Sequence, residues 1–144
     1  MEKNHCKDIN FFSENIKFDL KQKKQIKKWI VETIEHEKKI SGLINIIFCD
    51  DNYLLEVNKT YLKKEYLTDI ITFSFCENKV VSGDIFISID QVKENAKIFF
   101  TPFENELHRI IIHGILHLIG YNDKTTSLKQ TMTAMENKYL KLIS

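Results

Sequence analysis

His113 and His117 stand four residues apart in the sequence HGILHLIGYND, which ends at Asp123. Residues at positions i and i+4 of an α-helix project side by side, which is the arrangement that two imidazoles need in order to bind one metal ion. Gly120 interrupts the apolar run, and a turn there can bring Asp123 back as a third ligand. Two imidazoles and a carboxylate, with water in the fourth position, form an open zinc site of the catalytic type.

The helix that carries these histidines has a polar stripe on an otherwise apolar surface. At about 100° per residue, Glu106, Arg109 and the two histidines fall within roughly 80°, whereas leucines and isoleucines cover most of the remaining surface. Buried polar groups need partners, so the stripe faces either a metal ion or backbone carbonyls of the core. Gly114 lies within this helix and indicates the close approach of a ligand or of another packed element.

Strands and helices are predicted to alternate around this helix. Runs rich in β-branched and aromatic residues predict four strands, namely INFF from Ile9, LINIIFC from Leu43, TDIITFSF from Thr68 and GDIFISI from Gly83. Helical spacing and capping residues predict helices around residues 26–34, after Asp50 and Asp51, over 88–100, from a Thr101 N-cap to about Gly120, and after a Ser127 cap. The alternation favours an α/β or α+β fold in which helices cover a sheet.

The composition indicates one globular domain and narrows the possible partners. The chain has 144 residues, is 43% hydrophobic and carries a formal net charge of +1, so any nucleic-acid binding must come from a local patch. The three cysteines form no closely spaced pair and are expected to be reduced thiols. No apolar run reaches signal-peptide or membrane-span length, which predicts a cytoplasmic protein with no membrane partner.

HGILHLIGYND is similar to the signature of the YbeY family of bacterial rRNA-maturation endoribonucleases, whose usual form is H-G-x-L-H-L-x-G-Y-D-H. Further matches follow in the family's order: Asn58 with Tyr61, TDIITFSF in place of T-D-V-L-S-F, GDIFIS, and Met132 with Glu136. The resemblance covers most of the chain. It implies a single-domain α+β fold over residues 1–144, with a small mixed β-sheet covered by helices and the metal-binding helix at its centre.

The same resemblance implies a function. It suggests a single-strand-specific, metal-dependent endoribonuclease that matures the 3′ end of small-subunit ribosomal RNA, acts in ribosome quality control and works with the small subunit or its assembly factors. No DNA partner is expected. The residues alone support metal-assisted hydrolysis, with Zn²⁺ as the favoured ion and iron, nickel or manganese as alternatives. They identify no general base, and either water or the 2′-hydroxyl of the substrate remains open as the attacking group.

Two positions depart from the family pattern. Asp123 stands where the family has a third histidine ligand, and its negative charge should make the metal a weaker Lewis acid. Leu62 stands where the family has a functional arginine. Lys63, Lys64 and Arg109 are the candidates to contact the substrate phosphate instead. The alternatives are solvated lysines and a pair between Arg109 and Glu106 within the helix.

Two other functions compete with the ribonuclease. A zincin-like metallopeptidase would need a base from elsewhere, because Gly114 occupies the glutamate position of H-E-x-x-H. A metal-stabilised assembly or RNA-binding factor with little catalysis is the second alternative. For RNA binding, Lys59 joins Lys63 and Lys64 in one candidate patch. The lysine-rich stretch over residues 21–29 is either a second patch or a solvated helix face.

Overall fold

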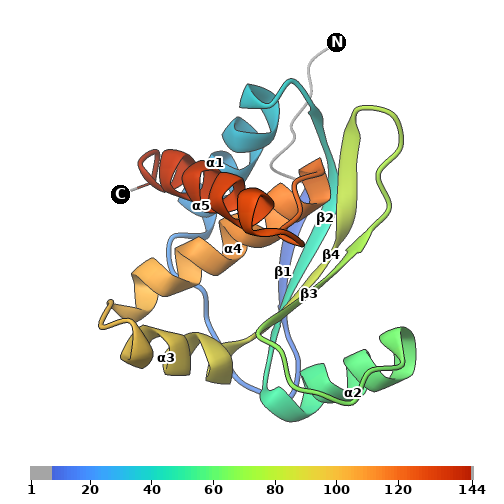
Figure 1. The fold of residues 1–144 in the computed structure, drawn as a ribbon, viewed down its shortest axis with the longest axis vertical. Helices are drawn as coiled ribbons and strands as arrows, with labels where there is room; N and C mark the ends of the chain where they lie inside the picture. The colour runs from blue at the N-terminus through green and yellow to red at the C-terminus, as the bar shows by residue number, and fades with distance from the viewer. Residues whose placement is uncertain (1–7, 144) are drawn as a thin grey trace.

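A computed structural model describes residues 8–143 and contains one four-stranded sheet and five helices within that range (Figure 1). The strands are β1 (Ile9–Ser13), β2 (Ile40–Cys49), β3 (Ile70–Ser74) and β4 (Val80–Ser88). The helices are α1 (Lys23–His36), α2 (Asp51–Leu62), α3 (Ile89–Ile98), α4 (Phe103–Ile119) and α5 (Thr126–Leu140). This architecture confirms the α+β prediction. None of the helices in the described range is long and apolar enough to cross a membrane.

The sheet is mixed, with strand order β1-β2-β4-β3. Strands β1, β2 and β4 run parallel, and β3 pairs antiparallel with β4 at the edge. The parallel pairs need crossovers, and α1 supplies the one between β1 and β2. This arrangement confirms the small mixed sheet that the family resemblance implies.

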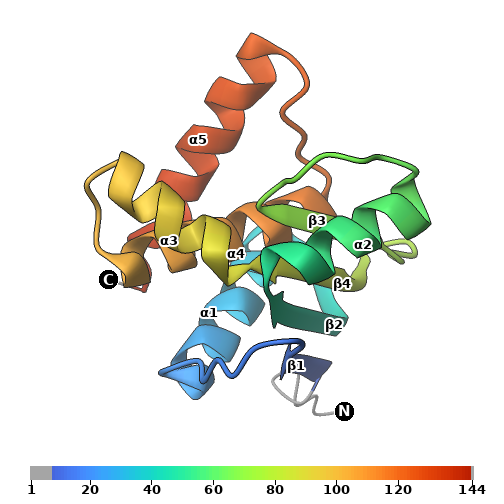
Figure 2. The same cartoon turned by 90° about the horizontal axis from the view of Figure 1, so that it is seen from below.

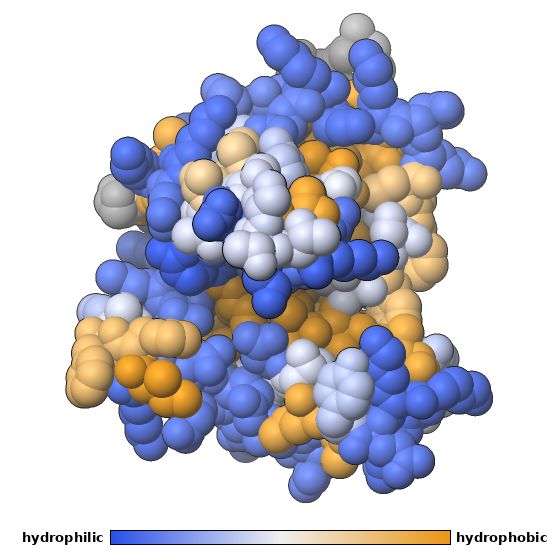
Figure 3. Space-filling view, in the orientation of Figure 1, coloured by the Kyte–Doolittle hydropathy of each residue, from blue (hydrophilic) through white to orange (hydrophobic). Residues whose placement is uncertain are grey.

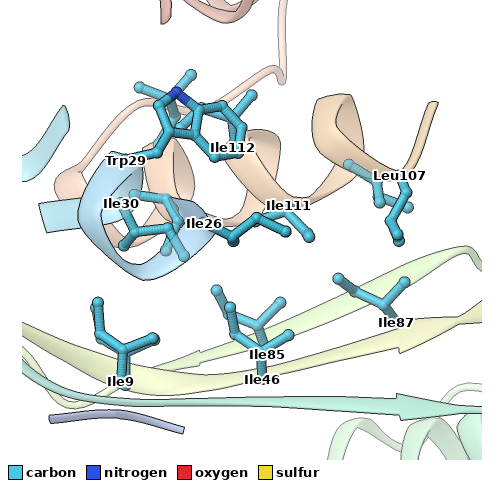
Figure 4. Close-up of a cluster of buried hydrophobic side chains, with 14 of the residues drawn as sticks. Ile9, Ile26, Trp29, Ile30, Ile46, Ile85, Ile87, Leu107, Ile111 and Ile112 are labelled. Carbon is cyan, nitrogen blue, oxygen red and sulfur yellow. The ribbon is translucent and has the colours of Figure 1, made fainter. Parts of the chain in front are cut away.

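Side chains alternate between the two faces of the sheet, and a different set of helices covers each face (Figures 1 and 2). Ile85 and Ile87 belong to the main core under α1 and α4, whereas Phe86, between them, packs with the smaller cluster under α2. Figure 4 shows the main core as two layers of side chains. Ile9, Ile46, Ile85 and Ile87 lie on the strands, opposite Ile26, Trp29 and Ile30 of α1 and Leu107, Ile111 and Ile112 of α4.

Helix α4 contacts both the sheet and the other helices, and Gly114 lies where the helix packs tightly on β3 and β4. A Cβ added at Gly114 would lie 2.9 Å from Cδ1 of Ile70 and 3.0 Å from Cγ2 of Ile85. The glycine is therefore explained by packing of the helix on β3 and β4, one of the two explanations that the sequence left open. A glutamate side chain does not fit at this position, which argues against the peptidase alternative.

Several predicted boundaries move in the structure. Thr101 does not cap α4, because its N–H donates to the carbonyl of Ala96 at the end of α3 and Pro102 takes the N-cap position without a side-chain hydrogen bond. The predicted Ser127 cap is also wrong, since Thr125 caps α5 by accepting from the N–H of Leu128 at 3.1 Å. The Asp50 cap of α2 is confirmed by the hydrogen bond from the Tyr53 N–H.

Two strands begin earlier than the sequence predicts. Strand β2 starts at Ile40 and β4 at Val80, because their pairing continues across a register shift between Ser41 and Ile44. Cys49 and Cys76 are free thiols, as predicted. Cys6, the third cysteine, lies outside the described residues.

Candidate metal centre

Helix α4 places His113 and His117 on adjacent turns of one face. Their ring centroids are 4.6 Å apart, and the two Nε2 atoms lie 3.0 Å from each other. Both side chains are only partly buried. The side-by-side arrangement predicted from the four-residue spacing is confirmed.

Gly120 turns the chain at the end of α4, with a φ of 129°. The N–H of Gly120 donates to the carbonyl of His117, and the N–H of Tyr121 donates to that of Leu116, which is the Schellman pattern at a helix end. The turn brings Oδ2 of Asp123 to 3.6 Å from Nε2 of His113 and 3.8 Å from Nε2 of His117. One ligand atom from each of these three residues lies within 4.8 Å of the others.

A carboxylate on α5 holds His113 in orientation. The Nδ1 atom of His113 lies 2.5 Å from Oε2 of Glu136, and the Glu136 side chain is buried. The other oxygen, Oε1, accepts from Arg109 at 2.9 Å, and a second guanidinium nitrogen donates to Asn137. A histidine that donates from Nδ1 to a carboxylate presents a bare Nε2, as metal-binding histidines do.

The charges around the two rings favour one positive charge in the site. Burial lowers the pKa of His113, but the hydrogen bond and charge of Glu136 and the charge of Asp123 outweigh it, so the pKa of His113 is raised overall. Burial lowers the pKa of His117, and the neighbouring His113 lowers it further. Two carboxylates thus lie beside two imidazoles, and a divalent cation would match this balance of charge.

The donor set fits a transition-metal ion. Imidazole nitrogens and a carboxylate oxygen are common zinc ligands, and three protein ligands leave one coordination position open for water or substrate. In the tautomer that donates from Nδ1 to Glu136, His113 presents an unprotonated Nε2 toward the Nε2 of His117. If the Nε2 atom of His117 is also unprotonated, a cation between the two nitrogens would stabilise their close approach. These three residues are therefore those that would hold the ion.

Arg109 makes its ion pair across helices. Its guanidinium binds Glu136 of α5 and Asn137, so this pair replaces the predicted pairing with Glu106 within α4. Burial raises the pKa of Glu106, while the charge of Arg109 opposes that rise. The contact makes Arg109 a support for the carboxylate that orients His113, and its role toward a substrate phosphate stays a prediction.

The predicted lysine candidates lie at the end of α2 and directly after it. Lys63 adopts a left-handed conformation with a φ of 57°, and Nζ of Lys64 lies 5.7 Å from the centre of the Tyr66 ring. The side chain of Asn58 donates to the carbonyl of Tyr66 at 2.8 Å and thereby folds this segment back over α2. Leu62 lines a pocket of 230 Å³ that this segment forms with β3, so an aliphatic side chain replaces a cation there.

This pocket borders the helix that carries the histidines. Ile70 of β3 lines the pocket and also packs against Gly114, the residue next to His113. In Figure 3 the surface is hollowed beneath α5, between this helix and the part of the molecule formed by α2 and the segment after it, and the floor of the hollow is hydrophobic. An extended polymer lying in this hollow would pass between α5 and the segment directly after α2, which carries Lys63 and Lys64.

The other lysine-rich stretch, over residues 21–29, lies mainly on the exposed face of α1. Nζ of Lys27 lies 5.9 Å from the centre of the Phe11 ring, and Lys23 pairs with Asp19 at 3.5 Å. In Figure 2, α1 lies at the lower left of the view and α2 at the right, and their buried side chains belong to two different core clusters. The two candidate RNA-binding patches are thus on different parts of the surface.

Sequence reasoning missed the residues that support the site. The match at Glu136 indicated a family position but not its contact with His113. Glu37, at the end of α1, accepts hydrogen bonds from Tyr121 and Tyr139, and nothing in its sequence neighbourhood marked it. Burial and the hydrogen bond to Glu37 raise the pKa of Tyr121 to about 12, and the same causes raise the pKa of Tyr139. Both hydroxyls therefore act as donors at neutral pH.

Comparisons with known proteins agree along nearly the whole chain. The family model described as Endoribonuclease YbeY matches residues 8–144. A Phocaeicola vulgatus protein named Endoribonuclease YbeY is 49% identical over 136 residues, which cover 94% of this chain and 99% of that protein. A Flavobacterium psychrophilum protein of the same name is 45% identical over 131 residues, covering 91% of this chain and 94% of that protein. The solution structure of TM1509 from Thermotoga maritima is similar with a TM-score of 0.67 and 29% identity, and the match covers 94% of this chain and 88% of that one.

Proposed function

The chain belongs to the endoribonuclease YbeY family, and on this premise we propose that it hydrolyses phosphodiester bonds of single-stranded RNA with the help of one divalent metal ion. The observation that carries the proposal is the convergence of three ligand atoms, from His113, His117 and Asp123, within 4.8 Å of one another. The buried Glu136 behind His113 supports it, because metal-binding histidines usually donate their other ring N–H to a group such as a carboxylate.

Zinc is the ion that we propose for this site. Two imidazoles and a carboxylate, with one position left open, are the ligand set of catalytic zinc. Bound there, the ion would supply Lewis-acid catalysis of phosphodiester hydrolysis near neutral pH. The protein contributes the fixed orientation of its ligands, since Glu136 orients His113 and Arg109 in turn holds Glu136.

We further propose that the substrate lies in the hollow between α5 and the segment after α2. Lys63 and Lys64 line this side of the molecule with positive charge, and Lys59 is one helical turn earlier on α2. The net charge of +1 gives little long-range attraction, so these lysines must provide the phosphate contacts locally. Leu62, in the position of the family's arginine, predicts slower cleavage than an arginine-bearing relative achieves.

The proposed biological substrate is the precursor of small-subunit ribosomal RNA at its 3′ end. The whole chain acts in this proposal as one catalytic domain in the cytoplasm, with the small ribosomal subunit or its assembly factors as partners. The proposal rests on family membership and on a metal site whose three ligands come from α4 and the turn that follows it.

One experiment combines the two parts of the proposal. Metal content of the purified protein is measured by mass spectrometry under native conditions, and the same preparation is tested for cleavage of a small-subunit rRNA precursor with and without a chelator. His113→Ala, purified identically, controls for contaminating nucleases. Stoichiometric metal and chelator-sensitive cleavage that His113→Ala lacks support the function. Metal and RNA binding without cleavage would instead favour an assembly factor, and the absence of bound metal under several loading conditions would overturn the catalytic proposal.

A further inference from the structure

Glu37 joins three parts of the fold through one carboxylate. It stands directly after α1, and its Oε1 accepts a hydrogen bond from the hydroxyl of Tyr121 at 2.8 Å. Its Oε2 accepts from the hydroxyl of Tyr139, which also contacts Nδ1 of His36 at 3.0 Å. Both oxygens of the carboxylate are therefore occupied by tyrosines from outside α1.

The two tyrosines belong to the elements that complete the metal centre. Tyr121 lies between Gly120 and Asp123 in the turn after α4, and its N–H donates to the carbonyl of Leu116, the residue before His117. Tyr139 lies one turn after Glu136 on α5 and is fully buried. A single carboxylate thus holds the segment that carries a proposed ligand and the helix that carries the partner of another ligand.

The position of Glu37 is electrostatically unfavourable for the helix itself. A negative charge at a helix C-terminus opposes the helix dipole, and cations are the usual residues there. The side chain is also partly buried, which adds a desolvation cost. The hydrogen bonds from the two tyrosine hydroxyls offset these costs. The negative charge of Glu37 is therefore better explained by its contacts with Tyr121 and Tyr139 than by any stabilisation of α1.

We propose that Glu37 is a positioning residue for the metal centre, acting through Tyr121 on Asp123 and through Tyr139 on Glu136. The inference rests on the proposed metal-dependent function, but it concerns residues outside the ligand set. It predicts that removing one tyrosine hydroxyl weakens metal binding although that hydroxyl contacts neither the metal nor a ligand side chain.

The test measures zinc affinity of the full chain by competition with a chromogenic chelator. Tyr121→Phe and Glu37→Gln are each expected to lower the affinity several-fold, less than the roughly tenfold or greater loss that follows removal of a group bonded directly to a ligand. Tyr121→Phe in an Asp123→Ala background should cause no further loss, because the hydroxyl acts through that carboxylate. Tyr139→Phe should likewise add nothing in a Glu136→Gln background. Tyr53→Phe is the matched control. Tyr53 lies on α2 and stacks on Phe86 of β4, away from the metal centre, so this variant should leave the affinity unchanged.

A purely structural role gives a different result. It would lower the free energy of unfolding, measured by urea titration of the metal-free protein, and would lower zinc affinity equally in the wild-type and Asp123→Ala backgrounds. Hydrogen exchange of metal-free protein gives a second readout: Tyr121→Phe should speed exchange of the amides of residues 122–125 and leave those of α2 unchanged. Zinc affinity unchanged in Tyr121→Phe, or uniform exchange, would overturn the positioning role alone. Failure of the wild-type protein to bind zinc would overturn the proposed function together with it.

Discussion

The Nδ1 atom of His113 lies 2.5 Å from the Oε2 atom of Glu136, although the two residues are 23 positions apart and belong to different helices. This contact fixes the ring so that its other nitrogen faces His117 and Asp123. A carboxylate behind a metal-bound histidine also raises the basicity of the ligand.

Glu136→Gln should therefore weaken zinc binding about tenfold, and Glu136→Ala up to about a hundredfold. The glutamine keeps the size of the side chain and an accepting oxygen but loses the charge, which explains the smaller loss. Isothermal titration with zinc measures both. Glu32→Gln, at an exposed position on α1, is the control. Equal affinities of the Glu136 variants and the wild type would show that the contact does not tune the site.

Replacements of Asp123 distinguish a ligand from a turn residue. Asp123→Ala should lower metal affinity sharply, and Asp123→Asn should also lower it because the charge that attracts the cation is lost. Asp123→His should retain metal, since imidazole is a good zinc ligand. Metal content and melting temperature, each with and without zinc, check all three. Full occupancy and an undiminished zinc-dependent shift in both the alanine and asparagine variants would mean that Asp123 only shapes the turn after Gly120.

Gly114→Ala should destabilise the protein by up to about 2 kcal/mol. The added methyl group would contact Ile70 and Ile85 at distances that require one of them to shift, and overpacking of this kind outweighs the gain of about 1 kcal/mol in helix propensity. Urea unfolding measures the change. Adding Ile70→Val, which removes the nearest methyl group, should recover part of the loss. A stabilised Gly114→Ala variant would show that the helix can move away from the sheet at low cost.

His108 should make the fold less stable as the pH falls. Its ring packs edge-on against Trp29, and its Nε2 is buried without a hydrogen-bond partner among the described residues. Burial lowers the pKa of His108, which the charge of Glu104 only partly opposes. The unfolded chain therefore binds a proton below a pH of about 6.5 while the folded chain does not, so the free energy of unfolding decreases as the pH falls from that value toward the folded pKa.

His108→Leu removes this contribution to the pH dependence. Its free energy of unfolding should decrease less than that of the wild type between about pH 7.5 and 5.5, because no proton binds at this position in the unfolded state. Urea titrations at several pH values check the difference between the two proteins, which cancels the other titrating groups. Parallel curves for the two proteins would contradict the assignment.

Charge reversal at the end of α2 should weaken RNA binding and flatten its salt dependence. Each phosphate of a single strand that the protein no longer neutralises reduces the slope of log K against log salt by about 0.7. Lys63→Glu with Lys64→Glu tests the candidate patch, and Lys24→Glu with Lys28→Glu on α1 is the matched pair. Fluorescence anisotropy with a short single-stranded RNA measures the slopes. A change only in the α1 pair would place the RNA-binding surface there.

The parts of the site that could be predicted are those set by short stretches of chain. The four-residue spacing of His113 and His117 fixes their relation on any α-helix, and Gly120 indicates the turn that returns Asp123. The strands could likewise be found from their composition, although the pairing of β2 with β4 extends both strands ahead of Leu43 and Gly83, where the sequence pattern begins.

The supporting contacts could not be predicted in the same way. The contact of Glu136 with His113 depends on how α5 packs against α4, and that of Glu37 with Tyr121 on how α1 ends beside the turn. No periodicity links such pairs in the sequence. The wrong cap of α5 has a more local cause, because residues 125–127 are all hydroxyl residues and any of them can cap a helix that begins nearby.

The order of elements along the chain affects how the protein is made. The sheet is complete once Ser88 has been synthesised, but α4, which covers its main apolar face and carries both histidines, ends only at Ile119. At bacterial rates of about 5–20 residues per second, the apolar side chains of β4 wait roughly 2–6 seconds for their cover. Because the three proposed metal ligands lie at residues 113–123, the site for the ion cannot form until all four strands of the sheet have been synthesised.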